Sequence, residues 1–312
     1  MKPAAITFLV LLLALPWLLP AYAVQVAIQA LVLAGFAMSF NFLFQNAGLL
    51  SFGHAAFFGA GAYTAALLMS KSGWGYLATL PAALGVTALV ALVIGFLSVR
   101  LTKIYFTMLT LAFAQMLWAV AHRWYNFTGG DNGINNVRPA GLFGTAHGLY
   151  YLSILCLAVI TVVLRSVSRS AAGYTLRAMR DNPARVAAIG VSAFEYVLAA
   201  FVLSGTLAGL SGFLQLAWQR SAFPDLLYWT TSAQAIIAAV LGGTSREYGP
   251  IAGAVVLVVA QAAVQSHTQY WPLALGLVLL ALVLFFPAGV VGLFSRRAGR
   301  REAAEEMDRA AA

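Results

Sequence analysis

Apolar runs and short polar segments alternate along the whole chain. Ten of the runs have the roughly 20 apolar residues that an α-helix needs to cross the hydrocarbon core of a bilayer. The pattern therefore predicts an all-α, polytopic membrane protein with about ten transmembrane helices. The predicted spans are residues 4–21, 24–43, 52–69, 75–98, 104–121, 148–165, 194–217, 227–243, 250–266 and 271–287.

The first run has two interpretations. Lys2, an apolar stretch over residues 4–19 and the sequence Ala21-Tyr22-Ala23 fit a signal peptide with its cleavage site. The same residues fit a first transmembrane helix that is retained. We expect the helix, because a retained helix makes the number of spans even, as two cytoplasmic termini require.

Composition supports the membrane assignment. Of the 312 residues, 62% are hydrophobic and 9% are charged, whereas soluble domains average about 25% charged residues, so the apolar excess must face lipid. The net charge of +9 does not indicate nucleic-acid binding, because the basic residues lie in short segments between apolar runs. The single cysteine, Cys156, excludes a disulfide within the chain, and we expect it to be a small buried hydrophobe.

The placement of basic residues orients the spans. With a cytoplasmic N-terminus, 14 of the 18 Lys and Arg residues fall in inner segments and four in outer segments. This excess satisfies the positive-inside rule, so we expect both termini in the cytoplasm. The predicted organisation is a transmembrane domain over residues 1–294 and a cytoplasmic tail over 295–312. Its long connections are an outer segment at about 122–147 and an inner segment at about 166–193.

The inner segment contains the signals of a short, sharply bounded helix. Asp181 or Asn182 is suited to cap its N-terminus, with Pro183 at the first helical position. Gly190 is suited to end it in the left-handed conformation. These signals predict a helix over residues 183–189, about 10 Å long at 1.5 Å per residue.

A second short helix is expected just before it, over residues 171–179, with Arg177 and Arg180 at or near its end. The capped pair has two interpretations. It is either a connector that separates two spans, or a rigid protrusion that docks into a cytoplasmic partner. The spacing alone leaves both open.

The inner segment also resembles a known family. The sequence GYTLRAMRDNPARVAAIGV at 173–191 is similar to the cytoplasmic loop of branched-chain amino acid type ABC permeases, the membrane subunits of high-affinity importers. The resemblance runs in order through most of the chain. Its other parts are SFGHAAFFGAGAYTAALL (51–68), IYFTMLTLAFAQ (104–115), TGGDNGI (128–134), AFVLSGTLAGLSG (200–212), LGGTSREYGPIAGA (241–254) and LFFPAGVVGLF (284–294).

In that family the loop contains a coupling helix that sits in a groove of the ATP-binding subunit. The resemblance therefore implies two ATP-binding subunits, a second homologous permease, an extracytoplasmic binding protein and the bacterial inner membrane. It implies branched-chain or related amino acids as substrates, with urea, short amides or aromatic acids as the alternative. The residues assigned to the coupling loop are Arg177, Arg180, Asp181, Asn182, Pro183, Arg185, Ala188 and Gly190. One departure is Ala187, where family members often have Glu.

The chain lacks the residues for ATP hydrolysis. Its three lysines, Lys2, Lys71 and Lys103, follow no glycine-rich phosphate loop, so ATP must be bound by partner subunits. The four histidines show no H-E-x-x-H or similar spacing, so we expect no enzyme, no metal site and no cofactor in this chain.

The main alternative class is an ion-coupled secondary transporter. Proton-coupled carriers usually need ionisable residues at membrane depth, and here only Glu195 and His54 fall within the spans, both near span ends. Sodium coupling, which can use backbone carbonyls, stays open. The polar residues of the span interiors are mostly amides and hydroxyls: Gln25, Gln29, Asn41, Gln115, Ser204, Gln215, Gln234 and Gln261.

Two groups of polar residues are candidates for the translocation path. Asn46, Ser51 and His54 surround the turn into the third span, where Ser51 either caps the helix or helps present N–H donors to a carboxylate. In the fifth span, Thr107 and Thr110 share a face, with Gln115 to one side. These either line the path or bond to neighbouring helices.

Small residues recur at four-residue spacing in the third and seventh spans, for example at Gly61 and Ala65 and at Gly205 and Gly209. This spacing favours close helix packing. The outer segment contains Thr128, Gly129, Gly130, Asp131 and Gly133, which favour tight turns. The resemblance implies instead that this loop contacts the binding protein.

Overall fold

The computed structural model describes residues 15–101, 103–188, 190–244 and 246–265, with residues 273, 276, 277 and 280. In these residues there is no β-strand, only one isolated bridge between Ile134 and Ala222. The long helices are α2 (Ala21–Ala47), α3 (His54–Ser72), α4 (Leu80–Ser98), α5 (Lys103–Arg123), α7 (Ala146–Ser168), α10 (Ala193–Gln219), α11 (Trp229–Gly242) and α12 (Gly249–Gln265). The short ones are η1 (Tyr76–Thr79), α6 (Tyr125–Thr128), η2 (Gly130–Asn132), η3 (Gly141–Gly144), α8 (Ala171–Asp181), α9 (Pro183–Ala188) and η4 (Pro224–Leu227).

The eight long helices coincide with eight predicted spans, from 24–43 to 250–266, which confirms the all-α, polytopic membrane fold. Most of the first and tenth predicted spans, and the tail over 295–312, lie outside the described residues. The choice between a cleaved signal and a retained first helix lies there too.

Five of the described helical segments are long and apolar enough to cross a membrane: α2, η1 with α4, α5, α7 and α10. The 19 residues of α3 are mostly buried, so this helix contacts protein more than lipid. At 14 residues, α11 is about 21 Å long, which is shorter than a hydrocarbon core of roughly 30 Å. The predicted span 227–243 was therefore right in position but too long for one helix.

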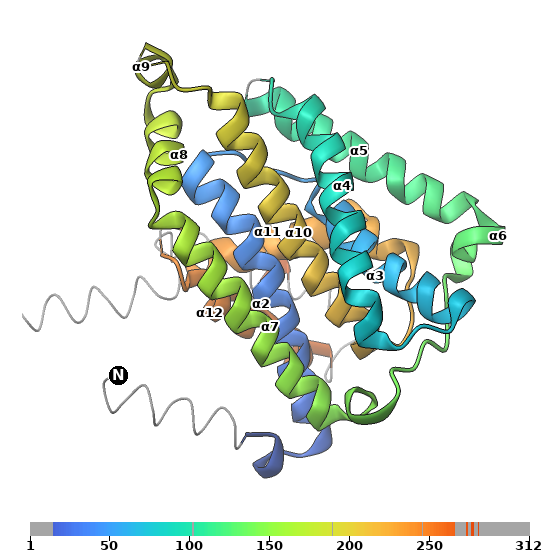
Figure 1. Cartoon of the computed structure of the whole chain (residues 1–312). Helices are drawn as coiled ribbons and strands as arrows, with labels where there is room; N and C mark the ends of the chain where they lie inside the picture. The colour runs from blue at the N-terminus through green and yellow to red at the C-terminus, as the bar shows by residue number, and fades with distance from the viewer. Residues whose placement is uncertain are drawn as a thin grey trace, which may run out of the picture.

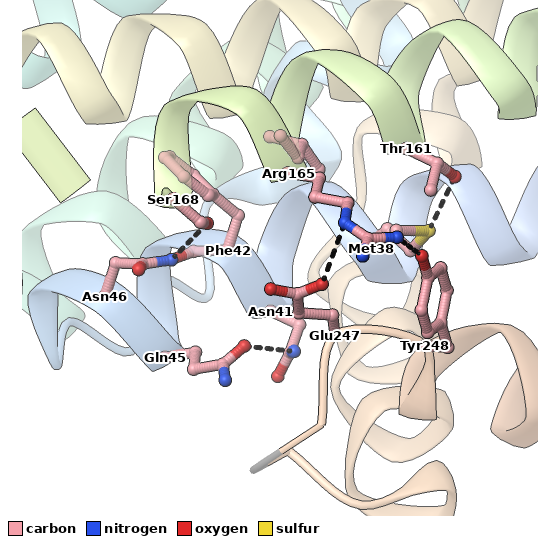
Figure 2. A pocket seen from close by; sticks show the side chains of 11 residues that line it. Met38, Asn41, Phe42, Gln45, Asn46, Thr161, Arg165, Ser168, Glu247 and Tyr248 are labelled. Carbon is pink, nitrogen blue, oxygen red and sulfur yellow. Dashed lines mark hydrogen bonds and ion pairs between the residues drawn. The ribbon is translucent and has the colours of Figure 1, made fainter. Parts of the chain in front are cut away.

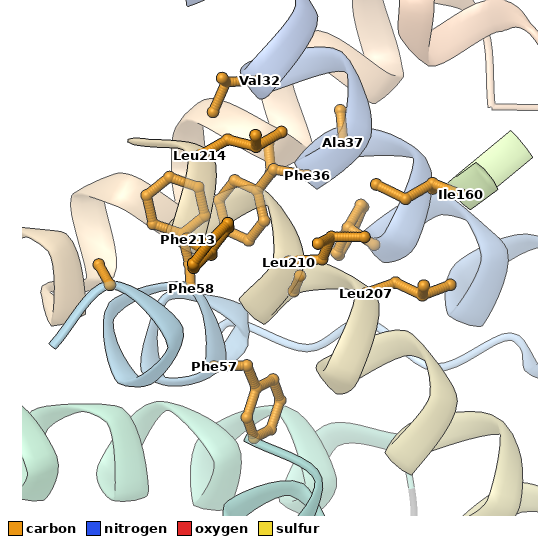
Figure 3. Packing of buried hydrophobic residues seen from close by; sticks show 14 of the residues in the cluster. Val32, Phe36, Ala37, Phe57, Phe58, Ile160, Leu207, Leu210, Phe213 and Leu214 are labelled. Carbon is orange, nitrogen blue, oxygen red and sulfur yellow. The ribbon is translucent and has the colours of Figure 1, made fainter. Parts of the chain in front are cut away.

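The core is built around α2 and α10, which lie side by side in the middle of the bundle (Figure 1). Buried side chains, among them Phe36, Phe58 and Phe213, fill the space between α2, α3 and α10 (Figure 3). Phe57 points away from α2 and contacts Phe201 of α10. The outer helices α4 and α5 keep large apolar side chains exposed, such as Leu89 and Met108. Such a surface suits lipid or another membrane subunit.

Close contact between α3 and α10 depends on glycine. A Cβ atom on Gly61 would lie 2.2 Å from the carbonyl oxygen of Gly209, and one on Gly212 would lie 1.8 Å from that of Phe58. Backbones this close leave no room for any side chain. The small-residue spacing in the sequence is therefore explained by helix packing.

The connections gather at two ends of the bundle. In Figure 1, α8 and α9 lie at the upper left, and α6 lies at the far right. Polar contacts between connections always join segments that the charge pattern assigns to the same side of the membrane. They link Arg180 to Gln45 and Arg165 to Glu247 on the predicted inner side, and Lys71 to Asn126 and Arg220 to Gly144 on the predicted outer side.

Candidate functional site

The inner segment folds as its capping signals predict. The side-chain oxygen of Asn182 accepts a hydrogen bond from the backbone N–H of Arg185 at 3.1 Å, and Pro183 begins α9. Asn182 is thus the cap, while Asp181 is the last residue of α8. Gly190 follows α9 in the left-handed region, with φ of 78°. The result is two short, separately bounded helices.

The first of them, α8, is fastened to the transmembrane core. Its buried face, Gly173, Leu176 and Met179, packs toward α2, α7 and α10. The half-buried guanidinium of Arg177 donates to the side-chain oxygen of Asn46 at 3.2 Å and to the carbonyl of Ser168 at 2.9 Å. One arginine therefore joins α8 to the C-terminal ends of both α2 and α7.

Arg180 adds a second attachment to α2. Its guanidinium donates to the backbone carbonyl of Gln45 at 2.5 Å, and its side chain lies against Gly48, the left-handed residue that ends α2. Cationic groups are favoured at helix C-termini, where carbonyl groups lack intrahelical partners. Arg177 and Arg180, which the resemblance assigns to contact with an ATPase, thus bind groups of their own chain.

The second helix, α9, presents most of its surface to the surroundings. Only Val186 is buried, with 6% of its surface exposed. The exposed residues are Pro183, Ala184, Arg185, Ala187 and Ala188. Of the predicted coupling-loop residues, those on α9 are exposed, as are Asp181, Asn182 and Gly190 beside it.

The residues predicted for the translocation path do not converge on one cavity. Ser51 does not cap α3, because that helix begins three residues later, with Gly53 at its cap position. Instead, the N–H of Ala55 donates to the Ser232 side chain of α11 at 2.8 Å. A residue from a distant part of the sequence therefore supplies the cap, which no local pattern indicates.

On α5, the polar side chains mainly bond to the backbone. The Thr107 hydroxyl lies 2.8 Å from the carbonyl of Leu50 and 2.9 Å from that of Lys103, while Thr110 donates to the carbonyl of Thr107. The Nε2 atom of Gln115 is buried and has no hydrogen-bond partner within the described part of the chain. Thr107 thus bonds α5 to the turn before α3, whereas Thr110 bonds within its own helix.

His54 is a core residue. Its Nε2 lies 2.8 Å from the hydroxyl of Ser204, which in turn donates to the carbonyl of Ser39 at 2.6 Å. The imidazole is fully buried beside the rings of Phe40 and Phe57, at centroid distances of 5.6 and 5.7 Å. It links α3, α10 and α2, and it lines neither of the two polar cavities described next.

A small crevice opens at the predicted inner end, between α2, α7 and the turn from α11 to α12 (Figure 2). Its volume is about 20 Å³, barely enough for a water molecule. Glu247 forms ion pairs with Arg165 at 3.6 Å and Arg169 at 3.5 Å, and Arg165 also donates to the Tyr248 hydroxyl. These contacts join α7 to the turn between α11 and α12 beside the crevice.

A larger cavity of about 250 Å³ lies near the opposite, predicted outer end, and we call it the outer vestibule. It is lined by α2, α3, α10, η4, α11 and α12. Sequence reasoning missed it, although four of its glutamines stood out as amides within apolar spans. Its polar lining consists of Gln29, Gln215, Gln219, Asp225, Thr231, Gln234 and Gln261.

The outer loop lies beside this vestibule. Ile134 and Ala222 exchange two backbone hydrogen bonds of 2.9 Å, which ties the loop to the segment between Gln219 and Asp225 of the vestibule lining. A Cβ atom on Gly133 would lie 2.3 Å from the carbonyl oxygen of Ala222, so this approach requires glycine.

The rest of the loop has the tight turns that its residues favour. Gly129, Gly130 and Gly133 all have positive φ angles. Thr128 bonds to the carbonyls of Ala121 and Trp124, and Asp131 lies 3.6 Å from His122.

Comparisons with known proteins agree with this architecture. Residues 22–287 match the family model described as branched-chain amino acid transport system / permease component. The chain is similar to the high-affinity branched-chain amino acid transport system permease protein LivM of Salmonella typhimurium strain LT2, at 27% identity, covering 91% of this chain and 73% of that protein. LivM of Escherichia coli strain K12 is 26% identical, with 92% and 74% covered.

A third relative matches over a shorter stretch. The high-affinity branched-chain amino acid transport system permease protein BraD of Pseudomonas aeruginosa is 29% identical over 54% of this chain and 53% of its own length. No solved structure matches the chain. The family model covers most of the sequence, including all eight long described helices except the first residue of α2. The chain therefore belongs to the branched-chain amino acid transport system permease family.

Proposed function

We propose that this chain is the membrane-spanning permease subunit of an ATP-binding-cassette importer in the bacterial inner membrane. It translocates branched-chain amino acids that an extracytoplasmic binding protein delivers. Two ATP-binding subunits supply the energy, a second homologous permease completes the complex, and this chain itself performs no enzymatic reaction. Family membership and the printed descriptions of the LivM relatives support this proposal.

The observation that carries the proposal is the construction of the α8–α9 region. A docking element must expose a surface to its partner and must also transmit force to the helices that move. Here α9 is exposed, while α8 is bonded to α2 through Arg177 and Arg180. Because α2 runs through the middle of the bundle, a displacement of α9 reaches the core through one short chain of contacts.

The alternative, an ion-coupled carrier, has less support. No Asp, Glu, Lys or Arg side chain is buried in the described part of the chain. His54 is buried, and Asp225, which lines the outer vestibule, is exposed in the predicted outer connection. His54 is enclosed by aromatic rings and bonded to Ser204. Proton-coupled transport usually relies on ionisable groups at membrane depth that face a path or cavity, and His54 faces neither of the two polar cavities.

Uptake of radiolabelled L-leucine by cells expressing the complete importer tests the energy source. We expect uptake to stop when ATP is depleted with arsenate and to continue for a time when a protonophore collapses the ion gradient. Uptake that survives ATP depletion but stops with the protonophore would contradict the proposal.

Docking is tested separately with Gly190→Pro, which disturbs the end of α9. We expect the ATP-binding subunits to be lost during copurification. Gly141→Pro is the matched control, because Gly141 also has a positive φ and open space around its Cα, but lies on the predicted outer side. Retention of the ATPase by Gly190→Pro, or its equal loss from both variants, would refute docking at this site.

A further inference from the structure

The outer vestibule has the size of a small-molecule site. Its volume of about 250 Å³ lies just below the range of roughly 300–1,000 Å³ that is typical of ligand pockets. Six separate elements contribute to it, so it is formed by the fold and not by one irregular loop. It is more than ten times as large as the inner crevice.

The polar groups of the vestibule are concentrated and unpaired. Five glutamine side chains line it, and within the described part of the chain their amides bond to no other protein group. A primary amide both donates and accepts hydrogen bonds, so this set can bind a carboxylate and an ammonium group alike. Asp225 is the one charged residue among those that line the cavity, and its carboxylate favours an ammonium partner.

The remaining lining is apolar. It consists of Val32, Leu33, Phe36, Phe58, Trp218 and Leu226. Phe36 and Phe58 are in ring contact at a centroid distance of 4.5 Å. An apolar side chain of a ligand would be desolvated against this wall, whereas a polyol would leave hydroxyl groups unpaired there.

Three of the glutamines also share a depth. Gln29, Gln215 and Gln261 each lie within about two turns of the predicted outer end of α2, α10 and α12. The vestibule thus lies just below the surface on which Ile134 pairs with Ala222. A ligand released at the outer loop would meet this cavity first.

We infer that the outer vestibule is the site that receives the transported molecule, and that it binds a zwitterionic amino acid with an apolar side chain. The glutamine amides bind the carboxylate and share the ammonium group with Asp225, while the apolar wall contacts the side chain. This inference rests on the proposed function, and it adds to it by locating the entrance of the path within this chain.

Thiol chemistry provides a test, because Cys156 is the only cysteine and is buried in α7. In a Cys156→Ala background, Gln234→Cys places a thiol in the vestibule. A membrane-impermeant, sulfonate-bearing methanethiosulfonate is then added from outside, and L-leucine uptake by the complete importer is measured. Ser72→Cys is the matched control, since Ser72 is exposed at the predicted outer end of α3 and does not line the cavity.

We expect the reagent to label both cysteines but to lower uptake by about tenfold or more only in Gln234→Cys, because a bulky anion would fill the site and repel the carboxylate. Labelling of Gln234→Cys without loss of uptake, or no labelling from outside, would overturn the inference. So would equal inhibition of Ser72→Cys.

The Cys156→Ala parent separates the two proposals. If the parent shows ATP-driven leucine uptake that labelling of Gln234→Cys does not affect, the inference fails while the proposed function stands. If the parent shows no ATP-driven uptake of any branched-chain amino acid, whereas unaltered protein does, the background is at fault and Cys156→Ser replaces it. If the unaltered protein shows none either, the proposed function fails and the inference with it.

Asp225→Asn provides a second readout of ligand class. We expect leucine uptake to fall about fivefold to tenfold, because a charge-assisted contact becomes a neutral one. Uptake equal to that of the unaltered protein would show that Asp225 does not contact the ligand. The reason to prefer a zwitterionic ligand would then be lost.

Discussion

The two ends of the bundle use polar residues in opposite ways. At the predicted inner end, Arg165, Arg177 and Glu247 are all bonded within the chain, and the crevice that Arg165 and Glu247 help to line has a volume of about 20 Å³. At the predicted outer end, five glutamines surround about 250 Å³ and remain unpaired within the described residues. The polar side chains of the inner crevice therefore include bonded ion pairs, whereas the glutamines of the outer vestibule stay available.

Helix α2 belongs to both ends. Gln29 and Phe36 line the outer vestibule, while Asn41 and Gln45 line the inner crevice, on a roughly opposite face of the same helix. Arg180 bonds the carbonyl of Gln45, so α8 is attached to a helix that also forms the vestibule wall.

The largest effect is expected where α3 and α10 meet between the two ends. Gly212→Val would place a Cβ atom 1.8 Å from the carbonyl oxygen of Phe58, so the two helices would have to separate. We expect a loss of about 3 kcal/mol or more of stability, at or above the upper end for overpacked cores. Thermal unfolding of the detergent-solubilised protein measures it.

The matched control is Gly85→Val in α4, where an added Cβ atom meets nothing within 4 Å. We expect this variant to unfold at nearly the temperature of the unaltered protein. Equal unfolding temperatures for Gly212→Val and Gly85→Val would show that the close contact between α3 and α10 does not stabilise the fold.

A smaller effect is expected from Arg177→Ala, which removes the bonds to Asn46 and Ser168. Hydrogen bonds of a charged group contribute about 1.5–3 kcal/mol, so we expect ATP-driven uptake to fall by about tenfold or more. The ATP-binding subunits should remain bound, because the surface of α9 is unchanged. Arg177→Lys keeps the charge but loses the two guanidinium nitrogens that bond to Asn46 and Ser168. We expect its uptake to lie between that of Arg177→Ala and that of the unaltered protein.

Copurification of the ATP-binding subunits, measured beside uptake, decides the role of Arg177. If Arg177→Ala lost them together with uptake, Arg177 would be a contact for the partner and not a link between α8 and α2.

The smallest effect is expected at the inner crevice. Glu247→Gln weakens two partly exposed ion pairs, each of which contributes about 0.2–1 kcal/mol. We expect ATP hydrolysis in the absence of amino acid to rise about twofold to threefold at low salt, because α7 is held less tightly to the turn between α11 and α12. At high salt the unaltered protein should approach the variant. If the difference in ATP hydrolysis between the variant and the unaltered protein did not depend on salt, the ion pairs would not be what holds this end together.

Much of the fold follows from the sequence, because lipid requires long apolar helices and short connections. Eight predicted spans coincide with helices, and the left-handed Gly190 follows from residue type, while the structure chooses Asn182 over Asp181 as the cap. The length of α11 did not follow, because residues 227–228 continue the apolar pattern without continuing the helix.

The site was less predictable because it depends on which helix faces meet. Gln29, Gln215 and Gln261 were visible as amides in apolar spans, but their spacing does not show that they surround one cavity. His54 was the more conspicuous residue, and the fold buries it among phenylalanine rings. The cap that Ser232 supplies to α3 also comes from a distant segment, beyond any local pattern.

The pairing of Ile134 with Ala222 has a consequence for biogenesis. Two membrane helices, α7 and α10, lie between these residues in the sequence. The two backbone hydrogen bonds can form only after both helices have been inserted and the second connection has reached the same face of the membrane. The pairing therefore marks a late stage of assembly, and a nascent chain that ends before residue 222 has an incomplete outer surface.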